Sequence, residues 1–180
     1  MDNNEFLIPL NGLASGRKDF RWKADKEFFG SFGNADILDA DLVAEVSAEK
    51  AGRSIDVDCR IEGTVTVRCD RCMEDLVLPV DSAAGLRVKF GDEPEGGEES
   101  TEDGREAIYL PSSDSNLDMR QVIYDYACLA LPMQRFHEDG KCNPDVISRL
   151  ESGISIQGTE SQVNPFSALA GLFDGEGGRS

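Results

Sequence analysis

The sequence predicts an α+β fold, with an antiparallel and partly barrel-like β-sheet in the N-terminal half and two or three helices in the C-terminal half. Apolar residues recur at every second position through much of the stretch from residue 20 to residue 90, which is the period of a strand buried on one face. Beyond residue 115 the apolar spacing becomes that of a helix. Strands that follow one another along the chain favour an antiparallel meander, which can curl toward a barrel.

The predicted strands follow this alternation in order. Glu62-Gly63 interrupts the longest alternating run, and we interpret the pair as the turn of a hairpin. Asp56, Asp58 and Thr66 take the face opposite to the apolar residues, as expected for a half-buried antiparallel pair. The strands are predicted around residues 20–22, 42–48, 55–61, 65–69, 76–80 and 86–90.

An acidic segment at about residues 91–106 separates the predicted sheet from the predicted helices. It carries eight acidic residues among glycines, with Arg105 as its only cation. Such a run repels itself and cannot bury apolar area, so we expect a flexible loop. The short apolar run at residues 107–110 should return the chain to the sheet.

The first predicted helix covers residues 119–130, where apolar side chains recur on one helix face. Ser115 with Asp118 three residues later resembles a capping box at its start. Leu131 precedes Pro132 and is therefore biased toward extended geometry, so the helix should end slightly before it.

A second helix is predicted to begin at Asn143-Pro144, because asparagine is a good N-cap and proline is favoured in the first helical turn. It should run to about residue 150. We divide the chain into a main domain at residues 1–152 and a linker with a C-terminal tail at 153–180. The tail contains the signals of one further short helix at 164–172.

The charge of the chain restricts its partners. The sequence holds 18 Lys and Arg against 35 Asp and Glu, a formal net charge of −17. A chain of this charge repels bare nucleic acid, so a strong grip on a phosphate backbone is not expected. Contact with RNA would need a local basic patch, a metal ion or a basic partner protein.

The N-terminal residues have no basic region followed by an apolar region, so no secretion signal is indicated. No stretch of the sequence approaches the roughly 18 apolar residues of a membrane helix. We therefore predict a cytoplasmic protein without membrane association. Five cysteines in a reducing compartment more often bind metal or perform redox chemistry than form disulfides.

The sharpest local motif is the C-x-x-C formed by Cys69 and Cys72. Two cysteines at this spacing on a tight turn can bind one tetrahedral zinc ion, but they supply only half of its ligands. His137 is the only histidine, and Cys142 follows it in a predicted loop between two helices. Cys69, Cys72, His137 and Cys142 therefore form a candidate Cys3His zinc site that would join the β half to the helical half.

Two other interpretations of the motif remain open at this stage. A solitary C-x-x-C also occurs in turns whose cysteines are small apolar fillers, and His137 beside two acidic residues is typical of a surface position. Thiol redox chemistry is disfavoured, because the acidic side chains flanking the pair disfavour a thiolate. Cys59 and Cys128 fit core positions of a strand and a helix.

Motifs of common enzymes are missing from the sequence. It contains no G-x-S-x-G, no G-x-x-x-x-G-K-[ST] and no G-x-G-x-x-G, so serine-hydrolase chemistry and nucleotide binding are not indicated. Basic residues in the strand region are interleaved with acidic ones, and a mixed solvated surface is favoured over a basic strip. These basic residues are Arg53, Arg60, Arg68, Arg71, Arg87 and Lys89.

Three motifs in a fixed order resemble the YceD-like family, which was long described as a domain of unknown function. Residues 69–73 read Cys-Asp-Arg-Cys-Met, where the family has C-x-R-C-L after a strand. Residues 117–119 read Leu-Asp-Met and open a helix, and residues 129–132 read Leu-Ala-Leu-Pro and close it. The resemblance spans about residues 55–143. Many relatives have several more cysteines after the L-P, where this chain has His137 and Cys142.

The resemblance implies a non-catalytic, cytosolic protein that supports accumulation of large-subunit ribosomal RNA. Its partners would be ribosomal RNA or ribosomal proteins, with the RNA contacted indirectly. Two alternatives come from other classes of protein. One is a zinc- or thiol-dependent enzyme that uses the Cys69/Cys72 turn, and the other is an acidic, chaperone-like binder of a basic ribosomal protein.

Overall fold

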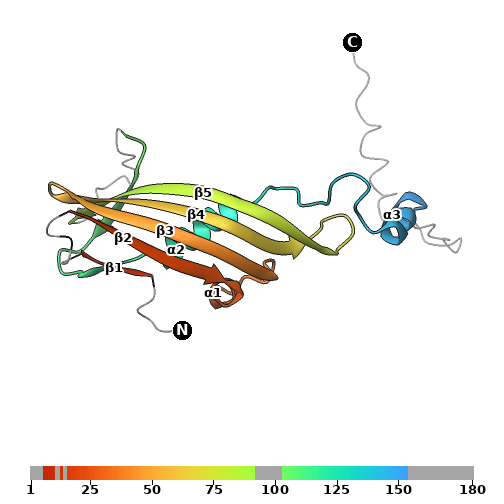
Figure 1. The fold of residues 1–180 in the computed structure, drawn as a ribbon, viewed down its shortest axis with the longest axis horizontal. Coiled ribbons are helices and arrows are strands. Elements are labelled where there is room, and N and C mark those ends of the chain that lie inside the picture. The colour runs from red at the N-terminus through yellow and green to blue at the C-terminus, as the bar shows by residue number, and fades with distance from the viewer. Residues whose placement is uncertain (1–5, 11–12, 14–15, 92–102, 154–180) are drawn as a thin grey trace, which may run out of the picture. The chain divides into compact units, whose positions relative to one another are not determined.

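A computed structural model describes residues 6–10, 13, 16–91 and 103–153. Its largest feature is a curved five-stranded sheet with the strand order β2-β3-β4-β5-β6 (Figure 1). Neighbouring strands are antiparallel except for β5 and β6, which are parallel. Since β2 and β6 stand at opposite ends of this order, the sheet is open and is not closed into a barrel. The strands are β2 (Arg17–Asp25), β3 (Asp39–Ala51), β4 (Ser54–Arg68), β5 (Asp75–Phe90) and β6 (Glu106–Leu110).

The described residues also form a small antiparallel sheet of β1 (Leu7–Pro9) and β7 (Asn116–Asp118). The described helices are α1 (Lys26–Ser31), α2 (Arg120–Leu129) and α3 (Pro144–Glu151). This architecture confirms the predicted α+β class, its largely antiparallel sheet and the two helices of the C-terminal half. None of the described helices is long and apolar enough to cross a membrane.

Helix α1 was not predicted. Its six residues are too few to display a helical period in the sequence. Asp25 caps it by accepting a hydrogen bond from the backbone N–H of Phe28 at 3.1 Å. Phe28 and Phe29 are buried and anchor the helix to the core.

The prediction of a hairpin turn at Glu62-Gly63 is wrong. Strand β4 runs through both residues without a break and pairs with β3 and β5 along its length. Gly63 has a φ of 144°, and a Cβ atom at this position would lie 2.1 Å from the carbonyl oxygen of Asp41. Glycine is needed here because the backbone of β3 approaches closely, and this is a common role of a glycine inside a strand.

The predicted strands at residues 76–80 and 86–90 are two parts of the single strand β5. Residues 81–85, which lie between them, were not assigned to a strand in the prediction. Ala84 keeps the two-residue period and is buried, so the inward face continues through it. The run at 107–110 joins the sheet as β6, as predicted, and pairs with β5.

The core of this part of the chain lies between the sheet and helix α2. Figure 1 shows α2 against one face of the sheet, where it contacts β4 and β5. Ile123 and Ala127 of α2 are buried, as are the inward-facing residues of β4 such as Val57 and Ile61. Burial of this apolar surface is the main force that holds α2 to the sheet.

Helix α2 ends before Pro132, as predicted, but it has no capping box at Ser115. Its first flanking residue is Met119, and no side chain caps it. The Ser115 carbonyl instead accepts a hydrogen bond from Leu10 at 2.8 Å. Asp118 accepts one from the backbone N–H of Arg120 at 2.9 Å. The residues that look like a cap in the sequence are used by the small sheet.

The chain divides into two compact units, and the break lies between Asn143 and Pro144. Helix α3 is the described element of the second unit, and it begins and ends close to its predicted bounds. The short helix expected at 164–172 lies outside the described residues, as does most of the acidic loop expected at 91–106. The described end of that loop is joined to the sheet, because the guanidinium of Arg105 lies 2.8 Å from the carboxylate of Asp58.

Candidate metal centre

Cys69 and Cys72 lie on the tight turn between β4 and β5. The backbone N–H of Cys69 donates to Glu74 at 2.8 Å, and that of Met73 donates to Cys69 at 2.9 Å. Met73 takes a φ of 62°, which lets the chain reverse direction directly after Cys72. Both cysteines are buried, so their sulfur atoms are held inside the turn.

His137 and Cys142 lie in the segment of residues 130–143 that follows α2. A turn closes within this segment, where the backbone N–H of Lys141 donates to Glu138 at 2.9 Å. Gly140, with a φ of 81°, supplies the left-handed residue of that turn. His137 is half-buried and Cys142 is buried.

Hydrogen bonds join this segment to the turn. The backbone N–H of Asp70 donates to the Arg135 carbonyl at 2.6 Å, and the Asp70 carboxylate accepts from the Arg135 N–H at 2.7 Å. The Asn143 amide donates to the Glu74 carboxylate at 2.6 Å. The turn and the segment therefore meet, although about sixty residues separate them in the sequence.

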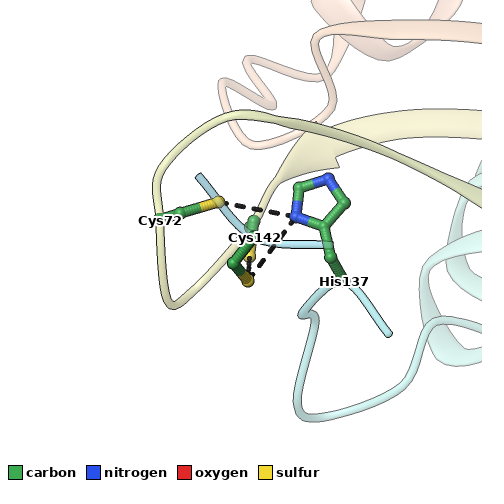
Figure 2. Close-up of side chains that lie close together, drawn as sticks. Cys72, His137 and Cys142 are labelled. Atoms are coloured by element: carbon green, nitrogen blue, oxygen red, sulfur yellow. Dashed lines mark hydrogen bonds between the residues drawn. The ribbon is translucent and has the colours of Figure 1, made fainter. Parts of the chain in front are cut away.

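The four candidate ligand atoms, one from each of Cys69, Cys72, His137 and Cys142, lie within 4.8 Å of one another. The sulfurs of Cys69 and Cys142 are 3.9 Å apart, and the Cys72 sulfur is 3.4 Å from Nδ1 of His137. Figure 2 shows the sulfurs of Cys72 and Cys142 directed at this nitrogen. Zinc bonds of about 2.3 Å to sulfur and about 2.0 Å to nitrogen require tetrahedron edges of about 3.8 Å and about 3.5 Å. The donor set therefore fits a tetrahedral ion.

The backbone orients the imidazole of His137. Its Nε2 atom lies 3.2 Å from the carbonyl oxygen of Asp75, which can only accept a hydrogen bond. The proton of the neutral ring therefore belongs on Nε2, and the lone pair of Nδ1 faces the sulfurs. Metal-bound histidines commonly hold their second nitrogen in this way.

The electrostatics of the cluster also fit a cation. Burial raises the pKa of the Cys69 thiol, but hydrogen bonds from the backbone N–H groups of Cys72, Arg71 and His137 outweigh burial and lower the pKa to about 6. Burial raises the pKa of Cys142, and the nearby sulfurs of Cys69 and Cys72 raise it further. A dication among these groups would favour their thiolate forms.

The two remaining cysteines lie away from this cluster. Cys59 is buried on the inner face of β4, and burial raises the pKa of its thiol to about 11. Cys128 lies in α2, 3.9 Å from the side-chain amide of Asn34. Both positions agree with the structural role predicted for them.

The exposed face of the sheet shows no basic strip among the described residues. Arg87 forms a double hydrogen bond with Asp56 at 2.7 and 2.8 Å. Arg60 lies 2.6 Å from Glu62. These two arginines of the strands are thus paired with acidic partners, in agreement with the predicted mixed surface.

Sequence reasoning missed the groups that support the four candidate ligands. The Asp75 carbonyl is a backbone group, and no sequence motif marks it. The Asp70–Arg135 and Glu74–Asn143 contacts depend on the path of the chain after α2. Only the short spacing of Asp70 and Glu74 from the cysteines could have pointed to them.

The chain is similar to one known protein family. The sequence profile of one family, described as large ribosomal RNA subunit accumulation protein YceD, matches residues 57–173. The match covers well over half of the chain and includes all four residues of the cluster. No curated protein and no solved structure was found to match.

Proposed function

This chain belongs to the YceD family, and we propose that it is a non-catalytic ribosome-biogenesis factor that supports accumulation of large-subunit ribosomal RNA in the cytoplasm. The family match over residues 57–173 is the observation that carries the proposal. It extends from β4 through the cysteine turn and α2 to α3, so it does not rest on the C-x-x-C motif alone.

Within this function, we propose that Cys69, Cys72, His137 and Cys142 bind one structural zinc ion. The tetrahedral edges and the orientation of His137 support this assignment. When bound, zinc would be coordinated by both the β4–β5 turn and the segment after α2, and would hold the two together. Structural zinc sites contribute folding energy in this way.

A catalytic role of the same cluster is less well supported. Catalytic zinc keeps one position open for water or substrate, whereas four protein donors fill a tetrahedral ion. The cysteines are also buried, which hinders thiol exchange with a substrate. These features favour the structural role over a zinc- or thiol-dependent enzyme.

We further propose that contact with RNA is indirect. The net charge of −17 opposes binding to a phosphate backbone, and the sheet arginines described above are already paired with carboxylates. A protein partner from the large subunit would avoid this repulsion.

Depletion of the protein tests the proposed function. We expect the amount of large-subunit ribosomal RNA to fall relative to small-subunit RNA, with fewer mature large subunits in a sucrose gradient. Re-expression of the wild-type chain should restore both. Unchanged RNA levels and subunit profiles after complete depletion would contradict the proposal.

A further inference from the structure

We propose that the surface around the cysteine cluster docks a basic protein segment that carries apolar side chains, contributed by a large-subunit ribosomal protein. The apolar part of this surface, here called the apolar rim, consists of Met73, Val77, Met133 and Phe136. The proposal rests on the proposed function, because it names the class of partner through which the protein would act on the large subunit.

The apolar rim consists of exposed apolar side chains on the segments that build the cluster. Among the described residues, seven large apolar side chains are exposed, and four of them belong to the rim. They come from the β4–β5 turn, the start of β5 and the segment after α2, which meet at the cluster. Grouped exposed apolar residues mark interaction sites more often than scattered ones do.

Arginine side chains contact two members of the rim, Phe136 and Met73. The guanidinium of Arg71 lies 4.9 Å from the centre of the Phe136 ring. Arg68 donates to the Met73 carbonyl at 3.1 Å. In the backbone register of β4 and β5 it lies opposite Asp75, two residues before Val77. Arginine, methionine and aromatic residues are enriched in the centres of protein interfaces.

Met73 and Arg135 also line a hollow of about 290 Å³, together with Leu38 and Arg68. Pockets for small-molecule ligands measure about 300–1,000 Å³, so this hollow is at the lower limit of that range. Its size and its mixed apolar and charged walls suit one side chain of a protein partner.

Met73 supplies an independent sign of function. Its φ of 62° is strained for any residue with a Cβ, and glycine would adopt it freely. The side chain is nevertheless 60% exposed and gains little burial in return. A residue that costs backbone strain without contributing to the core is typical of a functional position.

The charge around the cluster selects a basic partner. The turn at residues 69–75, the segment at 130–143 and the hollow residues Asp36 and Arg68 together carry six acidic side chains against four basic ones, a net charge of −2. Three thiolates around one zinc ion would add a further −1. The whole chain is at −17, so a positively charged protein would be attracted both at long range and on contact.

Binding to proteins extracted from purified large ribosomal subunits and freed of RNA tests the proposal. The zinc-loaded chain is immobilised, and the retained proteins are identified at about 50 mM and about 300 mM salt, where screening differs strongly. We expect a defined basic ribosomal protein to bind, and its affinity to fall at the higher salt. RNA from the same subunits, freed of protein, is the second probe and should not bind.

Met73→Gly is the decisive variant, because it relieves the strained φ while deleting the side chain. It should keep the wild-type stability and zinc content but lose affinity for the ribosomal protein by about tenfold or more, as expected of a central apolar contact. Phe136→Ser should weaken binding similarly. Leu150→Ser is the matched control, since Leu150 is also 60% exposed but lies in α3, and it should bind as the wild type does.

The outcomes separate this proposal from the proposed function. Unchanged binding of Met73→Gly, or retention of the RNA probe alone, would overturn the docking surface. Loss of ribosomal RNA on depletion, with no subunit protein retained by the wild-type chain, would also overturn it but would leave the proposed function standing. Tight, Met73-dependent binding with normal ribosomal RNA after depletion would support the surface and contradict the proposed function.

Discussion

Replacement of Cys72 by serine tests the ligand set of the proposed metal centre. The Cys72 sulfur is buried and lies 3.4 Å from Nδ1 of His137, so the substitution removes one corner of the tetrahedron. A serine hydroxyl is a poor ligand for zinc, which prefers thiolate and imidazole.

The size of the effect follows from the number of ligands. Structural zinc sites bind with about 10–16 kcal/mol near neutral pH, so one of four ligands contributes about 3 kcal/mol. Since about 1.4 kcal/mol corresponds to a factor of ten, Cys72→Ser should weaken zinc binding by on the order of 10²-fold. The fold itself should persist in the metal-loaded variant, because β4, β5 and α2 bury their apolar faces independently of the cluster.

Competition with a chromophoric zinc chelator measures this affinity directly. Cys128→Ser is the matched control, because it removes a thiol from α2 that lies outside the cluster. The reasoning is refuted if Cys72→Ser keeps the wild-type affinity, or if Cys128→Ser loses as much. The first result would mean that Cys72 is not a ligand, and the second that the loss of affinity is not specific to the cluster.

Three further predictions concern the fold and the cluster. Removal of zinc by a chelator should lower the midpoint temperature of thermal unfolding. It should also speed amide hydrogen exchange in residues 133–143 more than in β3, which mass spectrometry can measure. Equal exchange with and without metal would contradict a structural role. Gly63→Ala should lower the free energy of unfolding, measured by chemical denaturation, by about 3 kcal/mol or more, because a Cβ would overlap the Asp41 carbonyl. Gly52→Ala is the control. It has open space around it and should lower the free energy of unfolding by only about 1 kcal/mol. A hydrogen bond from Arg87 holds the pKa of Asp56 in the folded protein below its ordinary value. The pair therefore stabilises the fold at any pH above the ordinary pKa of an aspartate. This stabilisation is lost as the pH falls through the lowered pKa of Asp56. Arg87→Met should therefore be less stable than the wild type near pH 7, and the gap should close in acid; a gap that is independent of pH would argue against the pair.

The candidate ligands could be predicted from the sequence because zinc chemistry leaves few choices. A C-x-x-C pair needs two more ligands, and this chain has one histidine. Cys59 could be set aside because it alternates in phase with its apolar neighbours, and Cys128 because it lies inside a predicted helix. Cys142 was the remaining thiol, and it lies in a predicted loop close to His137. What the sequence could not provide was the path of the chain after α2, which brings Arg135 against Asp70.

The errors in the strand prediction share one cause. Gly63 and the small residues near Ala84 look like breaks when only neighbouring positions are compared. The two-residue period continues in phase on both sides of each, which is the property of one long strand. The close approach of β3 to Gly63 is a tertiary contact, and only the structure reveals that the glycine is needed inside a strand.

X-ray absorption at the zinc edge gives the most direct test of the metal centre, on protein purified without chelators or metal resins. The account predicts about one zinc ion per chain, surrounded by three sulfurs at about 2.3 Å and one nitrogen at about 2.0 Å. Protein that contains no zinc after this purification, or a zinc ion bound by oxygen and nitrogen alone, would contradict the assignment of Cys69, Cys72, His137 and Cys142.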